Sequence, residues 1–264
     1  MKVVILCGGQ GTRLREETEF RPKPLVEIAG RPILWHIMRI YASYGFNEFV
    51  LCLGYKGWLI KEYFLNYKAY NNDFTLQLGF DRAVDYHGSG PGHVDTSENW
   101  RITFVETGLN TMTGGRIKQA ARYIPDDEFL LTYGDGVADI NIADLVKFHR
   151  SHGRIGTVTS VTTPGRFGEL GVTSGLEVQC FSEKPTGGSN ISGGFFVFNR
   201  KILDRLSDDA TCVFEKGPME ELARDGELMA YRHTGFWQAM DTYREFVYLN
   251  ELWNKGEAPW KVWK

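Results

Sequence analysis

The 264-residue sequence has no long apolar segment, few cysteines and no marked excess of charge of either sign. Its longest apolar runs are only as long as a strand, so we expect neither a signal peptide nor a membrane span. The formal net charge is −3 and the pI is about 6.1. This balance gives no electrostatic reason to expect a nucleic acid or an anionic membrane as partner.

The four cysteines are far apart, and no pair has Cys-x-x-Cys spacing; they are Cys7, Cys52, Cys180 and Cys212. We therefore predict packed, reduced thiols in a cytoplasmic protein. The sequence also lacks a Ser/His/Asp triad signature, a His-Glu-x-x-His motif and hexapeptide repeats. The missing repeats exclude a left-handed β-helix.

An apolar run over residues 3–7 leads directly into a glycine-rich segment, Gly8-Gly9-Gln10-Gly11-Thr12-Arg13-Leu14, with Lys23-Pro24 further on. Glycines let successive N–H groups approach phosphate oxygens, and Arg13 and Lys23 add positive charge. The pattern predicts a strand that opens into a loop for a nucleoside triphosphate. The alternative is a glycine-rich turn flanked by two solvated cations.

Two better-known phosphate motifs do not fit this segment. A P-loop needs Gly-Lys-Ser/Thr, whereas Gly11 is followed by Thr12 and Arg13. The dinucleotide fingerprint needs a third glycine where Leu14 stands.

Strand-like and helix-like segments alternate through the first two thirds of the chain. We predict strands over 1–7, 49–53, 129–133 and 157–161, and helices over 33–44, 57–67, 115–123 and 140–149. This order indicates βαβ units and a largely parallel sheet, whose ligands lie beyond the carboxyl ends of the strands. Residues 8–13 and 134–136 follow such ends, so they should share one cleft. After Pro164 we predict short elements, clearest as a strand over 193–198 and helices over 219–224 and 243–253.

The glycine-rich segment followed by Lys-Pro resembles the signature of the sugar nucleotidyltransferases. Further stretches resemble one branch of this family, the glucose-1-phosphate cytidylyltransferases; they are residues 23–28, 31–38, 54–57, 110–116, 132–137, 165–168, 183–185, 193–196 and 235–242. They occur in family order along the whole chain, except between 81 and 100. The resemblance implies a Rossmann-like α/β fold with a mostly parallel central sheet flanked by helices and a small sugar-side subregion. It further implies one domain over 1–264, with a nucleotide-binding part (1–163) and a sugar-binding and C-terminal part (164–264).

The activity implied by the resemblance is Mg²⁺-dependent transfer of a cytidylyl group from CTP to α-D-glucose 1-phosphate. The products are CDP-glucose and pyrophosphate, for the dideoxysugars of cell-surface O-antigen, and the family suggests a homo-oligomer, with a hexamer as one candidate. The attacking phosphate is already ionised, so the reaction needs positioning and charge neutralisation rather than a general base.

Transfer from UTP or dTTP stays an alternative, since no derived feature separates cytosine from uracil. A non-catalytic nucleotide-sugar sensor stays another, although it would not need groups that act only in the transition state. A metal-dependent glycosyltransferase should show Asp-x-Asp, which Asp135-Gly136-Val137 lacks.

Two aspartates are the candidate Mg²⁺ ligands, because Mg²⁺ prefers one or two carboxylates plus phosphate oxygens and water. Asp135 lies between glycines at a strand end, and Asp241 precedes a helix. Asp135 could instead be a turn residue, and Asp241 could be the N-cap of that helix. In the family, matching aspartates hold the metal.

The resemblance assigns the remaining site residues. Lys23 and Arg13 would be catalytic, with Lys23 binding phosphate in the transition state. Nucleotide contacts would come from Leu6, Cys7, Gly8, Gly9, Gln10, Gly11, Thr12, Arg13, Asn110, Gly115, Arg116 and Gly134. Sugar phosphate contacts would come from Gly168, Glu183, Lys184 and Gly194.

Several of these residues have plainer alternatives. Residues 183–184 could be a solvated pair before a proline, and residues 110–116 could be only a turn and a helix start. Residues 195–198 indicate a core strand rather than a sugar platform. His149 and His152 could face one side of a helix as metal ligands, but we favour a solvated helix end.

Overall fold

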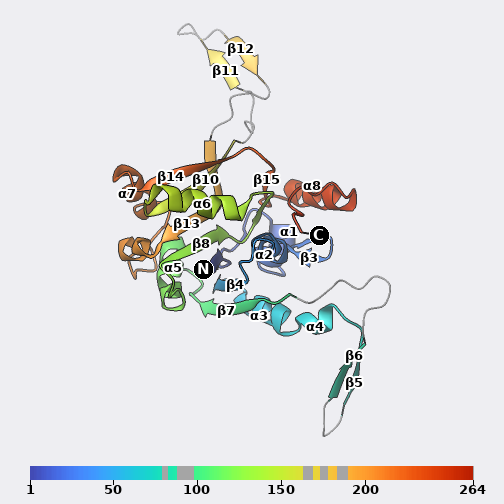
Figure 1. Cartoon of the computed structure of the whole chain (residues 1–264). Coiled ribbons are helices and arrows are strands. Elements are labelled where there is room, and N and C mark those ends of the chain that lie inside the picture. The colour runs from blue at the N-terminus through green and yellow to red at the C-terminus, as the bar shows by residue number, and fades with distance from the viewer. Residues whose placement is uncertain (79–82, 88–97, 163–168, 173–177, 183–189, 264) are drawn as a thin grey trace.

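A computed structural model describes residues 1–78, 83–87, 98–162, 169–172, 178–182 and 190–263. Its centre is a seven-stranded sheet with the order β14-β10-β13-β8-β1-β4-β7 (Figure 1). The strands are β1 (Val3–Leu6), β4 (Glu48–Leu53), β7 (Arg101–Glu106), β8 (Glu128–Tyr133), β10 (Gly156–Thr162), β13 (Asn190–Asn199) and β14 (Leu228–His233).

All neighbouring strands of this sheet run parallel except at β13, which is antiparallel to both β8 and β10. In the register of β1, Leu6 lies beside Cys52 of β4 and Tyr133 of β8. The carboxyl ends of β1, β4 and β8 therefore meet at one edge of the sheet. The predicted mostly parallel α/β sheet is confirmed. Because β10, β13 and β14 come from both sides of residue 164, the shared sheet supports a single domain, which stays a prediction.

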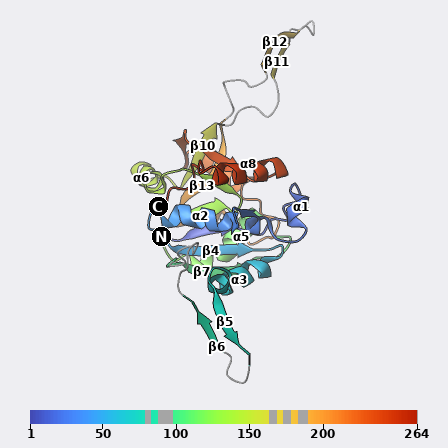
Figure 2. The same ribbon diagram turned by 90° about the vertical axis from the view of Figure 1, so that its right-hand side faces the viewer.

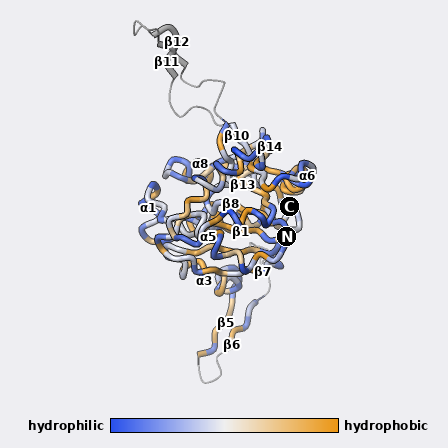
Figure 3. Tube along the Cα trace, turned by 90° about the vertical axis from the view of Figure 1, so that its left-hand side faces the viewer, coloured by the Kyte–Doolittle hydropathy of each residue, from blue (hydrophilic) through white to orange (hydrophobic). Residues whose placement is uncertain are grey.

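The sheet separates two hydrophobic cores, because side chains alternate between its faces along each strand. Val3 and Ile5 face one core, and Val4 and Leu6 face the other. On the first face lie α2 (Ile33–Ala42), α6 (Ile142–His152) and α8 (Tyr243–Asn254). On the second face lie α5 (Thr113–Ala120), η2 (Ala121–Tyr123), η3 (Arg200–Arg205) and α7 (Pro218–Arg224). Figure 3 shows hydrophobic residues concentrated in the body of the molecule around the sheet. Phe195, Phe196 and Phe198 are at most 1% exposed, which confirms a core strand there.

Four two-stranded sheets complete the fold. They are β2 (Glu27–Ile28) with β3 (Arg31–Pro32), β5 (Phe74–Gln77) with β6 (Ala83–Tyr86), β9 (Gly136–Ala138) with β15 (Trp237–Ala239), and β11 (Glu169–Val172) with β12 (Val178–Ser182). The β5–β6 and β11–β12 pairs lie outside the body of the molecule, at opposite ends (Figures 1 and 2). Short helices α1 (Arg15–Thr18), η1 (Lys23–Leu25), α3 (Gly57–Leu65) and α4 (Tyr67–Tyr70) follow β1 and β4. No helix in the described part of the chain is both long enough and apolar enough to span a bilayer.

Predicted helix boundaries were wrong where side chains or distant loops cap the helices. The helix expected over 140–149 begins at Ile142 because the Asn141 side chain accepts the Asp144 N–H, and it continues to His152, where Gly153 (φ 67°) ends it. The helix expected over 115–123 begins at Thr113, because the carbonyl oxygen of Cys212 accepts the N–H groups of Gly114 and Gly115.

The helix expected over 57–67 ends at Leu65, since Asn66 leaves the helical region and its side chain bonds Glu62 O. Strands β7 and β14 were not predicted. Both are edge strands of the large sheet.

Candidate active site

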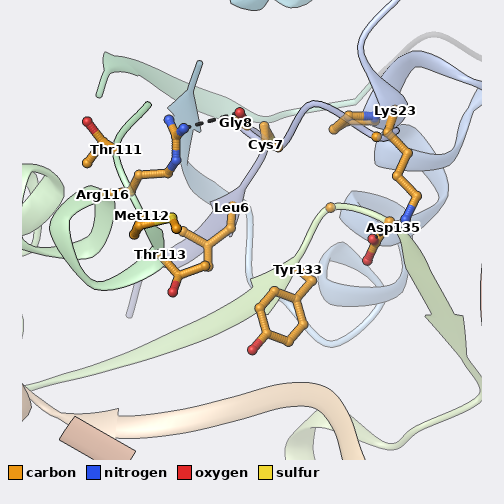
Figure 4. A pocket seen from close by; sticks show the side chains of 14 residues that line it. Leu6, Cys7, Gly8, Lys23, Thr111, Met112, Thr113, Arg116, Tyr133 and Asp135 are labelled. Atoms are coloured by element: carbon orange, nitrogen blue, oxygen red, sulfur yellow. Dashed lines mark hydrogen bonds and ion pairs between the residues drawn. The ribbon is translucent and has the colours of Figure 1, made fainter. Parts of the chain in front are cut away.

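Two cavities lie at the carboxyl-end edge of the sheet. The first holds about 280 Å³ and is lined by Leu6, Cys7, Gly8, Gly9, Gly11, Lys23, Pro24, Thr111, Met112, Thr113, Arg116, Tyr133, Gly134 and Asp135 (Figure 4). The second holds about 640 Å³ and is lined by Arg13, Thr132, Tyr133, Asp135, Gly136, Ser192, Gly193, Gly194, Phe195, Glu215, Trp237, Ala239 and Asp241. We call them the loop-side cavity and the β13-side cavity. Most of the residues predicted for the site therefore gather in one region.

The segment after β1 is a tight loop whose N–H groups are left without a protein acceptor. Gly11 adopts φ 63°, and the Thr18 hydroxyl bonds the carbonyl oxygens of Gly11 and Leu14. Within the described parts of the chain, the N–H groups of residues 8–13 donate to no protein acceptor. A row of unsatisfied backbone donors is a suitable site for phosphate oxygens.

Arg116 holds this loop in place through its buried side chain. Its guanidinium is buried and donates to the carbonyl oxygens of Gly8, Leu53, Gly108 and Leu109 and to the Thr107 hydroxyl, at 2.7 to 3.2 Å. A Cβ on Gly8 would lie 2.1 Å from Arg116 Nη1. Gly8 is therefore needed for close approach of the guanidinium. The predicted contact of Arg116 with nucleotide stays a prediction, because the described contacts of its guanidinium are all within the protein.

Lys23 joins the two predicted metal ligands. Its Nζ lies 2.5 Å from Asp135 Oδ2 and 2.5 Å from Asp241 Oδ1, and its side chain is only 13% exposed. Burial alone would lower the Lys23 pKa, but the charges and hydrogen bonds of the two aspartates outweigh burial and raise it. Lys23 is thus a firmly protonated cation, and the alternative of a solvated lysine is wrong. Arg13 lies 3.5 Å from Asp241 Oδ2 and is mostly exposed.

The capping alternative for Asp241 is wrong, and the turn in which Asp135 does lie leaves its carboxylate unexplained. The N-cap of α8 is Thr242, whose hydroxyl accepts the Glu245 N–H while the Glu245 carboxylate accepts the N–H of Thr242. The Asp135 carboxylate points to Lys23 rather than to its own backbone, as Figure 4 shows.

The donor chemistry of this pair fits a divalent cation. Both carboxylates converge on one ammonium nitrogen, so they can also converge on one metal ion, and carboxylate oxygens suit Mg²⁺. Among the described residues there is no group of three or more His, Cys, Asp or Glu side chains arranged to hold a metal. Ligand phosphates and water would have to complete the coordination.

Cys7 lines the loop-side cavity as a buried thiol. Burial, followed by the neighbouring Cys52 and Asp135, raises the pKa of the Cys7 thiol well above its ordinary value. Cys7, Cys52 and Cys212 are free cysteines.

Three residues without an assigned role connect the two cavities. Tyr133 donates its hydroxyl to Glu215 Oε1 at 2.6 Å, and the Thr113 hydroxyl donates to Glu215 Oε2 at 2.6 Å. Burial and the Glu215 charge raise the Tyr133 pKa, so its hydroxyl stays a donor. Thr113 and Tyr133 lie within family-like stretches, but Glu215 lies in the segment between η3 and α7, which carries no motif.

Some predicted contacts lie elsewhere. Gln10, Thr12, Asn110 and Gly115 do not line either cavity, and the N–H of Gly115, one of the expected nucleotide contacts, donates to Cys212 O at 3.2 Å. These roles stay predictions, and Gly115 would have to exchange that acceptor. Gly168, Glu183 and Lys184 lie outside the described residues.

The predicted solvated histidine pair on α6 is wrong for His149, which is 3% exposed. His149 Nδ1 and His152 Nε2 both hydrogen bond to the Thr157 hydroxyl, at 2.9 and 2.8 Å. A hydroxyl has one donor and can accept as well, so it bonds both rings when one imidazole donates and the other accepts. The pair packs α6 on β10.

Comparison with known proteins gives concordant matches. The family model for nucleotidyl transferase matches residues 2–246. A glucose-1-phosphate cytidylyltransferase of Salmonella typhimurium is 51% identical over 266 residues, covering 100% of both chains. A Bacillus subtilis protein named "Probable glucose-1-phosphate cytidylyltransferase" is 50% identical over the same length and coverage. The crystal structure of HddC from Yersinia pseudotuberculosis is 22% identical with a TM-score of 0.68, covering 96% of this chain and 99% of that one, and shows the shared fold.

Proposed function

The chain belongs to the nucleotidyl transferase family, and on that premise we propose that it is a glucose-1-phosphate cytidylyltransferase. It transfers the cytidylyl group of CTP to α-D-glucose 1-phosphate and releases pyrophosphate. The structural observation that carries the transfer chemistry is the convergence of Lys23, Asp135 and Asp241 beside the loop after β1. The choice of CTP rests on relatives of about half-identical sequence that bear this name.

The geometry suits a reaction that needs charge neutralisation and no base. The unbonded N–H groups of Gly8, Gly9 and Gly11, which line the loop-side cavity, would bind the triphosphate. Arg13 lines the adjoining β13-side cavity, from which its side chain would reach the same phosphates. Lys23 lines the loop-side cavity and lies between the two carboxylates, so its ammonium group can stabilise negative charge that develops on the transferring phosphate. An oxygen of the sugar phosphate would attack the α-phosphorus, and the bond from phosphorus to the pyrophosphate oxygen would break.

Mg²⁺ is the proposed cofactor, held by Asp135 and Asp241 together with ligand oxygens. When bound there, it would neutralise negative charge on the phosphates. Nucleotide would occupy the loop-side cavity and hexose 1-phosphate the β13-side cavity, with Glu183, Lys184, Gly168 and Gly194 on the sugar side. Mg²⁺ and the placement of the two substrates are proposals supported by the donor chemistry and the cavity linings. The roles of Gly168, Glu183 and Lys184 rest on the family resemblance alone.

We further propose a use for the product, an oligomeric state and a cellular compartment. The product would serve cell-surface dideoxysugar synthesis, the protein would act as a homo-oligomer, and it would work in the cytoplasm. Free thiols at Cys7, Cys52 and Cys212 are consistent with a reducing compartment.

Pyrophosphate release tests this function directly. The wild-type protein would be incubated with glucose 1-phosphate, Mg²⁺ and each of CTP, UTP, dTTP, ATP and GTP. We expect release with CTP above all others. Faster release with UTP or dTTP would change the base assignment, and nucleotide binding without release from any of the five would support a sensor.

A further inference from the structure

Tyr133 lies at the boundary between the two cavities. Only Tyr133 and Asp135 line both of them among the described residues. Asp135 is accounted for by its ion pair with Lys23, whereas the proposed chemistry uses no phenol. In the view of Figure 4, the Tyr133 side chain lies below the labelled Thr113 and Asp135, with its hydroxyl pointing away from the loop after β1.

The ring of Tyr133 is fixed on its flank by close packing. A Cβ on Gly194 (φ 78°) would lie 2.7 Å from Tyr133 Cδ2, so the ring uses space that only glycine leaves. The Phe196 ring meets the Tyr133 ring edge-on, with centroids 5.8 Å apart. The ring therefore has one well-defined place, provided that its outer end is held.

Glu215 holds that outer end. Its two carboxylate oxygens accept the Tyr133 and Thr113 hydroxyls, each at 2.6 Å, and the Thr113 oxygen in turn accepts the Phe214 N–H at 2.9 Å. We call Tyr133, Glu215 and Thr113 the carboxylate bridge. Hydrogen bonds to an ionised acceptor are stronger and shorter than neutral ones.

The segment that carries Glu215 is itself anchored. Ala210 O accepts the Met112 N–H at 2.7 Å, Cys212 O accepts the Gly114 N–H at 2.9 Å, and Phe214 is 1% exposed in the core beneath α5. The carboxylate, although exposed, is therefore presented from a segment that is anchored on both sides.

We propose that Tyr133 is a positioning residue whose ring forms the wall shared by the two substrates, and that Glu215 acts through it. This inference rests on the proposed function, because it needs a nucleotide in one cavity and a hexose phosphate in the other. A displaced ring would widen both cavities, so binding of both substrates should weaken together. The reacting groups Lys23, Asp135 and Asp241 would be unchanged.

Steady-state kinetics of Y133F, E215Q and the double variant test the proposal. Y133F keeps the ring and removes its hydroxyl, and E215Q keeps the side-chain size and removes the charge. Each should raise the KM of both substrates by about tenfold and leave kcat within about threefold. The double variant should be no worse than the more impaired single variant, because the two residues act as a unit. E221Q is the matched control, since Glu221 lies on α7 beside Arg205 and outside both cavities.

Three results would overturn the proposal: unchanged KM values with only a lowered melting temperature, a rise in one KM alone, or a fall in kcat without a rise in KM. Calorimetric titration with nucleotide alone distinguishes failure of this proposal from failure of the proposed function. If the wild-type protein binds UTP or dTTP instead of CTP, or binds without releasing pyrophosphate, the function is revised. The proposal is then tested by the affinity of Y133F for the nucleotide that binds, which should be about tenfold weaker than that of the wild type. Equal affinities of Y133F and wild type would refute it.

Discussion

Lys23 is the residue on which the proposed chemistry depends most. Its ammonium nitrogen lies 2.5 Å from one oxygen of each of two carboxylates, 112 and 218 positions away in the chain. A cation held so firmly is placed before substrate arrives, which is the condition for stabilising a transition state without reorganisation.

Replacing Lys23 with alanine should lower kcat by about 10² or more, the scale of a lost transition-state donor. The kcat of K23A would be measured by pyrophosphate release, alongside a melting curve to confirm folding. K61A is the matched control, because Lys61 pairs with Glu106 at the surface outside both cavities. A folded K23A protein with the wild-type kcat would remove Lys23 from the mechanism.

Asp135 and Asp241 should act as one unit in metal binding. Replacing either with Asn should weaken the Mg²⁺ dependence of pyrophosphate release, because each removes one anionic ligand. The double variant should lose much less activity than the product of the two single losses. Losses that multiply across the D135N/D241N cycle would show that the two carboxylates act separately.

At the scale of elements, the loop after β1 depends on a buried arginine from α5. The carbonyl oxygen of Gly8 accepts a hydrogen bond from Arg116, and the absent Cβ of Gly8 leaves room for the guanidinium. Gly9 faces open space. Of these two adjacent glycines, only Gly8 is required by close packing.

The G8A variant should therefore be less stable by about 1–3 kcal/mol, the usual cost of overpacking a filled site. G9A, its neighbour and control, should change the free energy of unfolding by no more than about 0.5 kcal/mol. Chemical denaturation of both variants measures the difference. Equal stabilities would mean that Arg116 can move aside and does not support the loop.

Packing of α6 on β10 should make stability depend on pH. Burial lowers the pKa of His149 from 6.5 to about 4; the Glu128 charge opposes this shift, and the charges of His152 and Arg150 add to it. Above pH 6.5 the ring is neutral in both states and contributes nothing to pH dependence. Between pH 6.5 and 4 the unfolded chain binds a proton that the folded one does not, so stability falls as pH falls, by on the order of 3 kcal/mol.

Urea unfolding at several pH values, compared between wild type and H149Q, measures this effect. H149Q should be less stable at pH 7, where it loses a packed ring, but its stability should fall less between pH 6.5 and 4. A pH profile parallel to that of the wild type would show that His149 is protonated in the folded protein.

At the scale of the whole molecule, the positions of the histidines agree with a mechanism that uses no general base. The described histidines His36, His87, His149, His152 and His233 line neither cavity, and His93 lies outside the described residues. His36 is fully buried, bonded to Ile28 O and to the indole of Trp260.

Replacing each of the six histidines with Gln in turn should leave kcat within about tenfold of wild type, below the usual contribution of a general base. H36Q is the variant that we expect to lose the most stability, so its fold must be checked before its rate is interpreted. A well-folded variant that lost about a thousandfold in kcat would contradict positioning plus charge neutralisation.

Local pattern in the sequence was enough to predict the strands of the inner sheet, the loop after β1 and the family. These features depend on residues close in sequence: apolar runs, glycines where the backbone must approach a ligand, and Lys-Pro just beyond. The pairing of Asp135 with Asp241 was only a hypothesis at that stage, because each aspartate also had a turn or capping role open to it. Helix ends were misplaced where the caps came from side chains or from loops far along the chain, as Cys212 does for α5.

Only the tertiary structure decided which distant groups meet. Lys23 lies between Asp135 and Asp241 because β1 and β8 are parallel neighbours and because β15 pairs with β9, which bring the segments that follow to one edge. Arg116 proved to be a support of the loop, and Glu215, 82 positions from Tyr133, carries no local signal at all. The physical reason is that local backbone preferences are encoded by neighbouring residues, whereas contacts between distant segments depend on sheet register and core packing.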